Sequence, residues 1–403
     1  MAESSEFILT PEFQFSAEQR HLRSAVREFC AENFDERAVR RLMESDRRVD
    51  PAVWSRLGSE LGVLGLAVPV DAGGAGGAGG AGGSLVDQAV AVEEFGARLA
   101  CGPLFGTVYL SIPALAACPS SDIRDSLLTS LVDGERTAAF AVTDRAGTFD
   151  ADDVAVTAGA GPDCALDGTV ERVVDAGWAD HLLVAARSPD GVCLYAVDAT
   201  ASGVERNPLV TLDLTRPQAT VHFRDADAHR VAGPDETSEA IARALRVGSA
   251  LLAVEQVGAS QHLLDLAVDY AKTRMQFGRH IGSFQAVKHR LADMLVDLEH
   301  ARSTAYHAVW ALAEESPEST LAVSIAQATC SAAFSRIAAD TIQVHGGIGF
   351  TWEHQAHLYF KRAATDAVLL GSAEQHRSRV AELVLDTASV ARQPVPVADG
   401  TPG

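Results

Sequence analysis

The sequence has few cysteines, and none of them is spaced for metal binding. Its six cysteines are scattered, with no C-x-x-C pair, which fits free thiols in a reducing compartment. No apolar run reaches the roughly 18 residues that a membrane-spanning helix needs, and the N-terminus lacks the basic start and apolar stretch of a secretory signal. We therefore expect a cytoplasmic protein with no disulfides, no structural metal and no membrane contact.

The sequence is also short of basic residues. Its 33 Lys and Arg face 54 Asp and Glu, a net charge of −21, which excludes a nucleic-acid partner because such a partner demands a basic face. An anionic cofactor would have to be held by local positive groups and helix ends. Motifs of other enzyme classes are missing too: there is no G-x-S-x-G elbow, and no G-x-G-x-x-G follows a strand.

Apolar spacing divides the 403 residues into three regions. Helical spacing runs from Ser16 to Ala100, short β-type runs lie between about Ala138 and Val231, and helical spacing returns after Asp235. We expect an α+β fold with an N-terminal helical domain (1–135), a middle β-barrel or sandwich (136–236), a C-terminal four-helix bundle (237–390) and a disordered tail (391–403). The expected strands are 138–142, 181–185, 192–197 and 219–223, and the expected C-terminal helices are 240–274, 285–314, 318–344 and 366–390.

Two further patterns favour ordinary structural roles. The Gly-Gly-Ala repeats at 73–83 predict a flexible loop and not a phosphate cradle, because no strand precedes them and no Lys-Ser/Thr follows. The apolar residues Val287, Leu291, Met294, Leu295 and Leu298 form one helical stripe, which predicts core packing in a helix bundle.

Three local motifs make the chain resemble one family, the acyl-CoA dehydrogenases, from about residue 13 to residue 385. The longest is Arg274-Met-Gln-Phe-Gly-Arg-His-Ile-Gly-Ser-Phe-Gln285, followed by Gln343-Val-His-Gly-Gly-Ile-Gly-Phe350. The N-terminal region adds Leu61-Gly-Val-Leu-Gly-Leu-Ala-Val-Pro69 and Glu93-Glu-Phe-Gly96. Their order along the chain matches that of the family.

The resemblance implies FAD as cofactor and a site shared between two subunits. It places Arg274, Gln276 and Phe277 at the adenosine and pyrophosphate end, where the arginine fork suits phosphate oxygens. It assigns the same cofactor to Gln343, Gly346, Gly347, Thr143 and Ser372. Glycines let main-chain N–H groups approach a phosphate, but taken alone they signify only a helix stop, and Thr143 alone would be an ordinary β-former.

The same resemblance leaves the catalytic base missing. The family removes the α proton of an acyl thioester with a Glu that precedes a Gly-Thr pair, and here Leu370 occupies that position before Gly371-Ser372. Glu374 lies past the pair and is a poor substitute. The alternative base position of some relatives corresponds to Gly248 and Ser249, which cannot serve. Glu255 lies two turns further along the same helix face and is a candidate base, against the alternative of a carboxylate paired inside the bundle.

The flavin-contacting segments also depart from the family pattern. Ala141-Val-Thr-Asp144 stands in place of a Thr-Glu-Pro turn, and Gly168-Thr-Val-Glu-Arg-Val-Val-Asp175 in place of a Lys and Trp-x-Thr pattern. Hydrogen bonding to the flavin ring is therefore expected to be incomplete. His354 and His357 beside Glu353 lack a third ligand at metal spacing, so we interpret them as surface or interface residues.

Three hypotheses follow for function. The first is the base-lacking subunit of a heteromeric acyl-CoA dehydrogenase, such as a heterotetramer acting on steroid side-chain or other bulky acyl-CoA thioesters. The second is a homo-oligomeric enzyme that uses Glu255, and the third is a structural or acyl-thioester-binding member that has lost dehydrogenation. The resemblance further implies an electron-transfer flavoprotein as electron acceptor.

Overall fold

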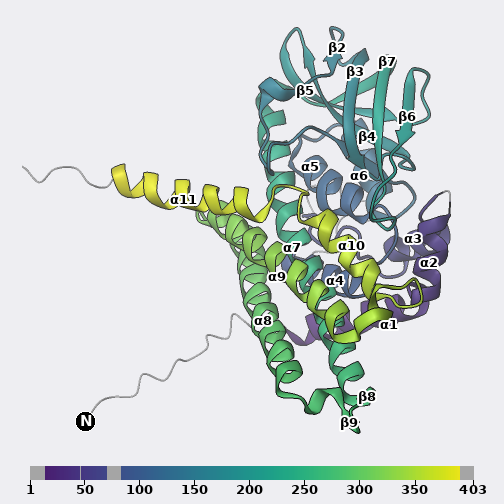
Figure 1. The fold of residues 1–403 in the computed structure, drawn as a ribbon. Helices are drawn as coiled ribbons and strands as arrows, with labels where there is room; N and C mark the ends of the chain where they lie inside the picture. Colours follow the sequence, from purple (N-terminus) through teal and green to yellow (C-terminus); the bar gives the residue numbers. More distant parts are fainter. Residues whose placement is uncertain (1–13, 46, 70–82, 391–403) are drawn as a thin grey trace, which may run out of the picture.

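A computed structural model describes residues 14–45, 47–69 and 83–390, which form helical, β and helical regions in that order (Figure 1). The α+β order predicted from the sequence is confirmed. Apart from Gly83, the predicted Gly-Gly-Ala loop lies outside the described residues, and so does the predicted tail.

Side-chain caps fix where the N-terminal helices begin. The side chains of Ser16 and Ser84 each accept a hydrogen bond from the backbone N–H three residues later. The side chain of that later residue in turn accepts a hydrogen bond from the backbone N–H of the serine. Both helices therefore start with a capping box. Asp50 caps a helix that opens with Pro51, the position where proline fits a helix best. The helices are α1 (Ala17–Asn33), α2 (Glu36–Glu44), α3 (Pro51–Ser59), α4 (Leu85–Ala97), α5 (Ile112–Ala117) and α6 (Asp122–Val132).

A π-helix, η2 (Leu104–Ser111), joins α4 to α5, and all eight of its residues are buried. Such helices are rare and often occur at functional sites. η2 packs between the first strand of the β region and the long helix α7 (Pro234–Thr273). A Cβ at Gly248 of α7 would lie 2.5 Å from the Leu110 side chain, so this glycine lets the two helices approach closely.

The middle region is a closed β-barrel. Its strands are β1 (Ala138–Ala141), β2 (Thr157–Ala158), β3 (Asp163–Val174), β4 (His181–Ser188), β5 (Gly191–Asp198), β6 (Val204–Pro208) and β7 (Gln218–Ala232). The ring closes through β4, β2, β3, β7 and β5, with β1 paired to β4 and β6 to β7. All four predicted strands are present. The sequence pattern did not single out β3, whose alternation is broken by Gly168 and by a bulge between Val170 and Val173.

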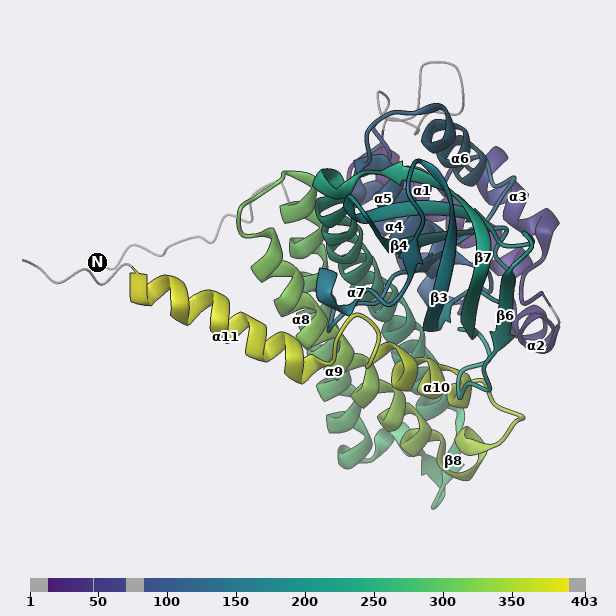
Figure 2. The ribbon, with the colours of Figure 1, turned by 90° about the horizontal axis from the view of Figure 1, so that it is seen from above.

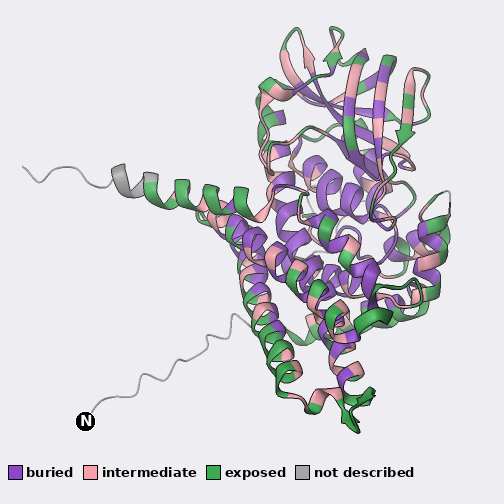
Figure 3. Ribbon diagram, viewed as in Figure 1, coloured by how far each residue is buried: buried purple, intermediate pink, exposed green. Residues whose placement is uncertain are grey.

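The C-terminal region is built around α7. With it pack α8 (Gln285–Ala313), α9 (Ser319–His345) and α10 (Ala356–Asp366), while α11 (Ala373–Val390) packs against α9. The hairpin β8 (Met275–Gln276) and β9 (Arg279–His280) connects α7 to α8. In both ribbon views α11 points away from the rest of the molecule (Figure 2). Buried residues concentrate in α7 and in α4, α5 and α9, which pack against it, whereas the hairpin is exposed (Figure 3).

Glycines bring the N-terminal helices directly against α7. A Cβ on Gly96 would lie 2.1 Å from the carbonyl oxygen of Glu255, and one on Gly258 would lie 1.9 Å from that of Glu93. The α4 and α7 backbones therefore touch, and no larger residue fits at either position.

Two predictions about the C-terminal helices are wrong in part. The last helix was expected to begin at Asp366, but α11 begins at Ala373 because Leu370 and Gly371 both have positive φ (54° and 104°) and break the helix. Leu295 was assigned to the core stripe of α8, but it is 48% exposed while Met294 and Leu298 are buried. The buried face of this part of α8 is thus narrower than the stripe suggested.

Within the described part of the chain, the segment Ser319–Phe350 alone is long and apolar enough to cross a membrane. Two thirds of its apolar window are buried inside the protein. It contains α9, which packs against α7, α8, α10 and α11, as expected of a central bundle helix.

Candidate active site

A cavity of about 330 Å³ lies where the three regions of the chain meet. Phe105 and Leu110 of η2, Leu245 of α7, strands β1 and β3, and the turn after α10 form its walls. Of the residues predicted to be functional, the cavity brings together Thr143 and Leu370. Its size is in the range of small-molecule sites, and we call it the central cavity.

Leu370 is buried at the wall of the central cavity. It is 5% exposed, with φ +54°, and its carbonyl accepts a hydrogen bond of 2.8 Å from Nε2 of His376. A Cβ on Gly147 would lie 2.5 Å from the same carbonyl oxygen. The backbone of the Leu370 turn is therefore in close contact with the loop after β1. Among the described residues, the Leu370 N–H has no hydrogen-bond acceptor.

Charged groups from the barrel line the other side of the central cavity. Asp144 accepts a 2.6 Å hydrogen bond from the Gly147 N–H, and burial raises the pKa of its carboxyl. Glu171 and Arg172 of β3 reach the same cavity. Sequence reasoning noted these segments only as departures from a pattern and did not identify their side chains as cavity residues.

Ser372 lies just past the cavity turn, where it caps α11. Its hydroxyl accepts the Gln375 N–H at 3.3 Å and its N–H donates to the Gln375 side chain at 2.9 Å. Glu374 sits exposed in the first turn of α11. Neither residue lines the central cavity, although Gln375 does.

The residues predicted to hold the pyrophosphate and adenosine end of the cofactor lie at the C-terminal end of α7 and in the β8–β9 hairpin. Arg274 ends α7, as predicted, and its side chain is exposed with no ion pair to any described residue. Gln276 is also exposed, and Phe277 is 89% exposed with its ring edge-on to Phe284.

Gln343, Gly346 and Gly347 lie at the same end of the molecule. The Tyr270 ring, four residues before Arg274, stacks on His345 with centroids 4.4 Å apart. Gln343 is exposed, and a Cβ on either glycine would meet nothing within 4 Å. The backbone here is open to a ligand, and Gly346 has a φ of +65° that favours glycine.

The predicted cofactor residues thus fall into two groups at opposite ends of α7. Leu245 lines the central cavity and Arg274 follows the last turn of the same helix, 29 positions later. At 1.5 Å per residue, about 40 Å separates them. Thr143 and Arg274 of one chain therefore cannot contact the same part of one bound molecule.

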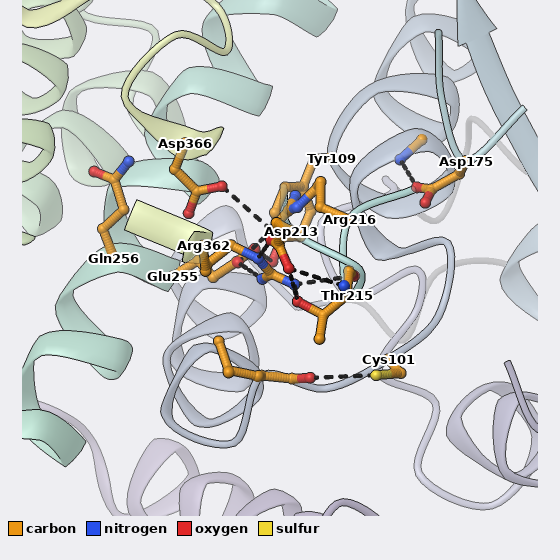
Figure 4. Close-up of polar contacts among 12 residues, drawn as sticks. Cys101, Tyr109, Asp175, Asp213, Thr215, Arg216, Glu255, Gln256, Arg362 and Asp366 are labelled. Atoms are coloured by element: carbon orange, nitrogen blue, oxygen red, sulfur yellow. Dashed lines mark hydrogen bonds and ion pairs between the residues drawn. The ribbon is translucent and has the colours of Figure 1, made fainter. Parts of the chain in front are cut away.

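Glu255 is the centre of a buried ion cluster assembled from all three regions (Figure 4). Its carboxylate pairs with both Arg216 and Arg362 and accepts a 2.7 Å hydrogen bond from the Tyr109 hydroxyl. Arg362 also donates to Asp213 at 2.7 Å and to the Thr215 hydroxyl at 2.6 Å. The cluster joins η2, the loop between β6 and β7, α7 and α10.

The charge state of this cluster is set by burial and by the two arginines. Burial acts to raise the pKa of Glu255, but Arg216 and Arg362 outweigh it and lower the pKa to about 2. Burial raises the pKa of Asp366, whose nearest ion-pair partner is Arg216 at 3.8 Å, to about 7. The space lined by Glu255 holds only about 10 Å³, no more than a single water requires.

Sequence reasoning missed every partner of Glu255. Tyr109, Asp213, Arg216 and Arg362 are scattered over more than 250 positions and belong to no periodic pattern. No local signal in the sequence pointed to these partners, since Arg362 follows Lys361 in a helix that also carries His357 and Asp366.

Neutralising Asp366 should make the fold more stable at high pH. Its pKa is raised in the folded state, so the native protein gains stability from the protonated form and loses it as pH rises from about 4 through about 7. Asp366→Asn should remove that loss and raise the thermal midpoint at pH 8 relative to the parent, with little change at pH 4.5. The control is Glu374→Gln in the exposed first turn of α11. If both variants change the thermal midpoint at pH 8 equally, the raised pKa of Asp366 is not the cause of the effect.

His354 and His357 pack against other rings close to Gln343 in the sequence, His354 against His345 and His357 against Trp352. The His354 ring is 4.3 Å from that of His345, and the His357 ring is edge-on to Trp352 at 4.7 Å. The interpretation of His357 as a surface residue does not hold within this chain, where it is 6% exposed. In the described ranges no group of three His, Cys, Asp or Glu side chains could hold a metal ion.

Comparison with known proteins identifies the fold. The family model for the acyl-CoA dehydrogenase N-terminal domain matches residues 16–135, and the model for the C-terminal domain matches residues 238–385. Acyl-CoA dehydrogenase IpdE2 of Mycobacterium tuberculosis is 34% identical over 355 residues, covering 88% of this chain and 93% of that protein. The chain therefore belongs to the acyl-CoA dehydrogenase family, a family of FAD-binding oxidoreductases.

Two solved structures that resemble the chain are complexes of two proteins by their titles. The ChsE4-ChsE5 complex from Mycobacterium tuberculosis matches with a TM-score of 0.80 and 28% identity, covering 95% of this chain and 100% of the compared chain. A Tcur3481-Tcur3483 steroid ACAD matches with a TM-score of 0.80 and 29% identity, covering 92% and 99%.

Proposed function

We propose that this chain is the base-lacking subunit of a heteromeric acyl-CoA dehydrogenase that desaturates an acyl-CoA thioester between its α and β carbons. The observation that carries the proposal is Leu370. It is buried at the wall of the central cavity, and the resemblance puts it where the family's catalytic glutamate is expected. A leucine cannot accept a proton, so the base for this reaction has to come from a homologous partner.

The alternative base, Glu255, is poorly placed for proton transfer. All its contacts are inside the ion cluster, and it lines a space too small for an acyl chain. A pKa lowered to about 2 also makes it a weak base near neutral pH, since a general base works best with a pKa near the operating pH. We therefore assign Glu255 a structural role.

The residues present fit FAD, but as two half-sites. When bound by these residues, FAD would supply the acceptor for the β hydrogen, which leaves the substrate as a hydride. Arg274, Gln276, Phe277, Gln343, Gly346 and Gly347 offer an exposed cation, an exposed ring and open backbone for its pyrophosphate and adenosine end. Thr143 and Leu370 line the central cavity, and the Leu370 N–H has no acceptor among the described residues, so these groups would suit the ring and the thioester carbonyl.

The distance between the half-sites supports a shared site. Because about 40 Å of α7 separates them, each half-site of this chain needs the opposite half-site of another chain. The two-protein relatives make a homologous subunit the preferred partner, in a heterotetramer, and the steroid ACAD suggests a bulky acyl group. We propose an electron-transfer flavoprotein as electron acceptor and the cytoplasm as compartment.

The proposal is tested by the visible spectrum of the chain purified alone and co-expressed with a homologous subunit, before and after anaerobic addition of acyl-CoAs. Flavin absorbance that bleaches only in the co-expressed complex is the expected result. Bleaching in the lone chain would refute the base-lacking role. If the complex binds neither flavin nor acyl-CoA, the hypothesis that this chain is a non-catalytic structural member of the family would be supported instead.

Replacing Arg274 with alanine should weaken FAD retention by the complex. A bidentate arginine–phosphate contact contributes about 1.5–3 kcal/mol, so the FAD dissociation constant should rise roughly 10- to 100-fold. The readout is flavin absorbance per protein after gel filtration. Lys272→Ala is the matched control, because Lys272 is an exposed cation in the last turn of α7 paired only weakly with Asp269 at 3.8 Å. Equal FAD losses in both variants would contradict the assignment.

A further inference from the structure

A second cavity lies between the N-terminal helices and the C-terminal bundle. It measures about 540 Å³, against about 330 Å³ for the central cavity, and no described residue lines both. Its walls come from α4, η2, α5, the first half of α7 and the C-terminal end of α8, and we call it the α4–α7 pocket. Its volume is within the range of about 300–1,000 Å³ that is typical of small-molecule sites.

The periodicity of α7 separates this pocket from the central cavity. Arg243, Val247 and Leu251 line the α4–α7 pocket at four-residue spacing, so they share one face of the helix. Leu245, which lines the central cavity, lies two positions after Arg243 and therefore points to nearly the opposite side, since successive residues are about 100° apart. The α4–α7 pocket is thus a site of its own and not an extension of the central cavity.

Much of the lining of the α4–α7 pocket is aliphatic. The side chains that form these walls include Leu85, Val108, Ile112, Val247 and Leu251. A ligand with an apolar body would remove this surface from water, which is favourable in proportion to the area covered. The walls by themselves therefore select an apolar ligand body without fixing its orientation.

Gln88 of α4 supplies a hydrogen-bond acceptor inside the α4–α7 pocket. The residue is 2% exposed, and its Nε2 donates to the Val63 carbonyl oxygen at 2.9 Å. A carbonyl oxygen only accepts hydrogen bonds, so the amide nitrogen has to face Val63 and Oε1 is left over. Oε1 has no donor among the described residues and is not one of the unpaired atoms sealed off by protein. Because buried acceptors are normally paired, this oxygen is available to a donor on a ligand.

Arg243 adds an unpaired cation to the same pocket. It is partly exposed, and its guanidinium makes no ion pair or hydrogen bond within the part of the chain that the structure describes. By contrast, Arg246 pairs with Glu239 at 2.7 Å. A free guanidinium beside an apolar cavity suits a carboxylate, which matches its planar fork. Glu315 also lines the pocket, but it is exposed, so solvent and salt screen its charge.

We propose that the α4–α7 pocket binds an amphiphilic carboxylate, a molecule with an apolar body, a free carboxylate and a hydroxyl group. The carboxylate pairs with Arg243, the hydroxyl donates to Oε1 of Gln88, and the apolar body covers the aliphatic walls. Binding is reversible and involves no covalent step. Because the pocket is separate from the central cavity, the inference does not depend on the proposed function.

The test is isothermal titration calorimetry of the full chain with ω-hydroxydecanoate, decanoate and the terminal decanediol, which differ in their end groups alone. The parent should bind ω-hydroxydecanoate most tightly. Arg243→Met should weaken binding of both carboxylates about 10- to 100-fold, as expected for one charged contact, and leave the diol unchanged. Arg246→Met is the matched control and should change none of the three. If the parent binds none of these probes, or binds the diol as tightly as ω-hydroxydecanoate, the proposal is wrong.

Two further variants locate the bound molecule. Gln88→Met removes the acceptor and should abolish the preference for ω-hydroxydecanoate over decanoate, which one neutral hydrogen bond sets at about 2- to 10-fold. Ala116→Trp places a large ring on a partly exposed wall of the pocket and should abolish binding. Binding that survives Ala116→Trp would lie elsewhere and would overturn the proposal. If Gln88→Met does not fold, because it also leaves the Val63 carbonyl unpaired, the Arg243 and Ala116 variants still decide.

Discussion

Replacing Leu370 with glutamate should create a dehydrogenase site in this chain. A positioned general base contributes about 10²- to 10⁴-fold to rate, and position 370 is buried at the wall of the central cavity. The backbone is already in the conformation required, since leucine and glutamate pay a similar cost at φ +54°. Burial should also raise the pKa of the new carboxyl toward neutrality, which favours its use as a base.

The measurement is the rate of flavin bleaching after anaerobic mixing of the flavin-loaded Leu370→Glu protein with acyl-CoA. Leu370→Gln is the control, because it matches glutamate in size and polarity but cannot take up the proton. A rate gain of at least about 10²-fold in the glutamate variant alone is expected. If both variants are as slow as the parent, the absence of a carboxylate at 370 is not what limits this chain.

Glu255→Gln should cause a large loss of stability. Two buried arginines, Arg216 and Arg362, would lose their shared carboxylate, and breaking a buried ion pair by removing one partner costs about 3–5 kcal/mol. The cluster also joins three regions of the chain, so its loss should loosen their packing. We expect a markedly lower thermal midpoint for the complex, measured by differential scanning calorimetry.

Tyr109→Phe serves as the graded comparison for this prediction. It removes a single hydrogen bond to the same carboxylate, so about 1.5–3 kcal/mol should be lost. Turnover per bound FAD separates the two roles of Glu255. A Glu255→Gln protein that keeps its stability but loses turnover would establish Glu255 as the base and overturn its structural assignment.

Much of the fold was determined by local sequence. Helical spacing, the capping residues Ser16 and Ser84, and short β-branched runs depend on residues a few positions apart, so they can be recognised without a structure. The signature residues around Arg274 and Gln343 are likewise contiguous. Leu370 could be singled out as the residue at the expected base position because the Gly-Ser pair follows it directly.

The tertiary structure alone decided what these pieces do together. Glu255 read in sequence is a carboxylate on a helix, but in the fold it joins Arg216 and Arg362, which lie 39 and 107 positions away. The closed barrel, the central cavity and the separation of the two half-sites similarly depend on contacts between distant segments. No local pattern encodes such contacts, because they result from how the three regions pack against α7, where backbone contacts at Gly96 and Gly258 fix the distance between helices.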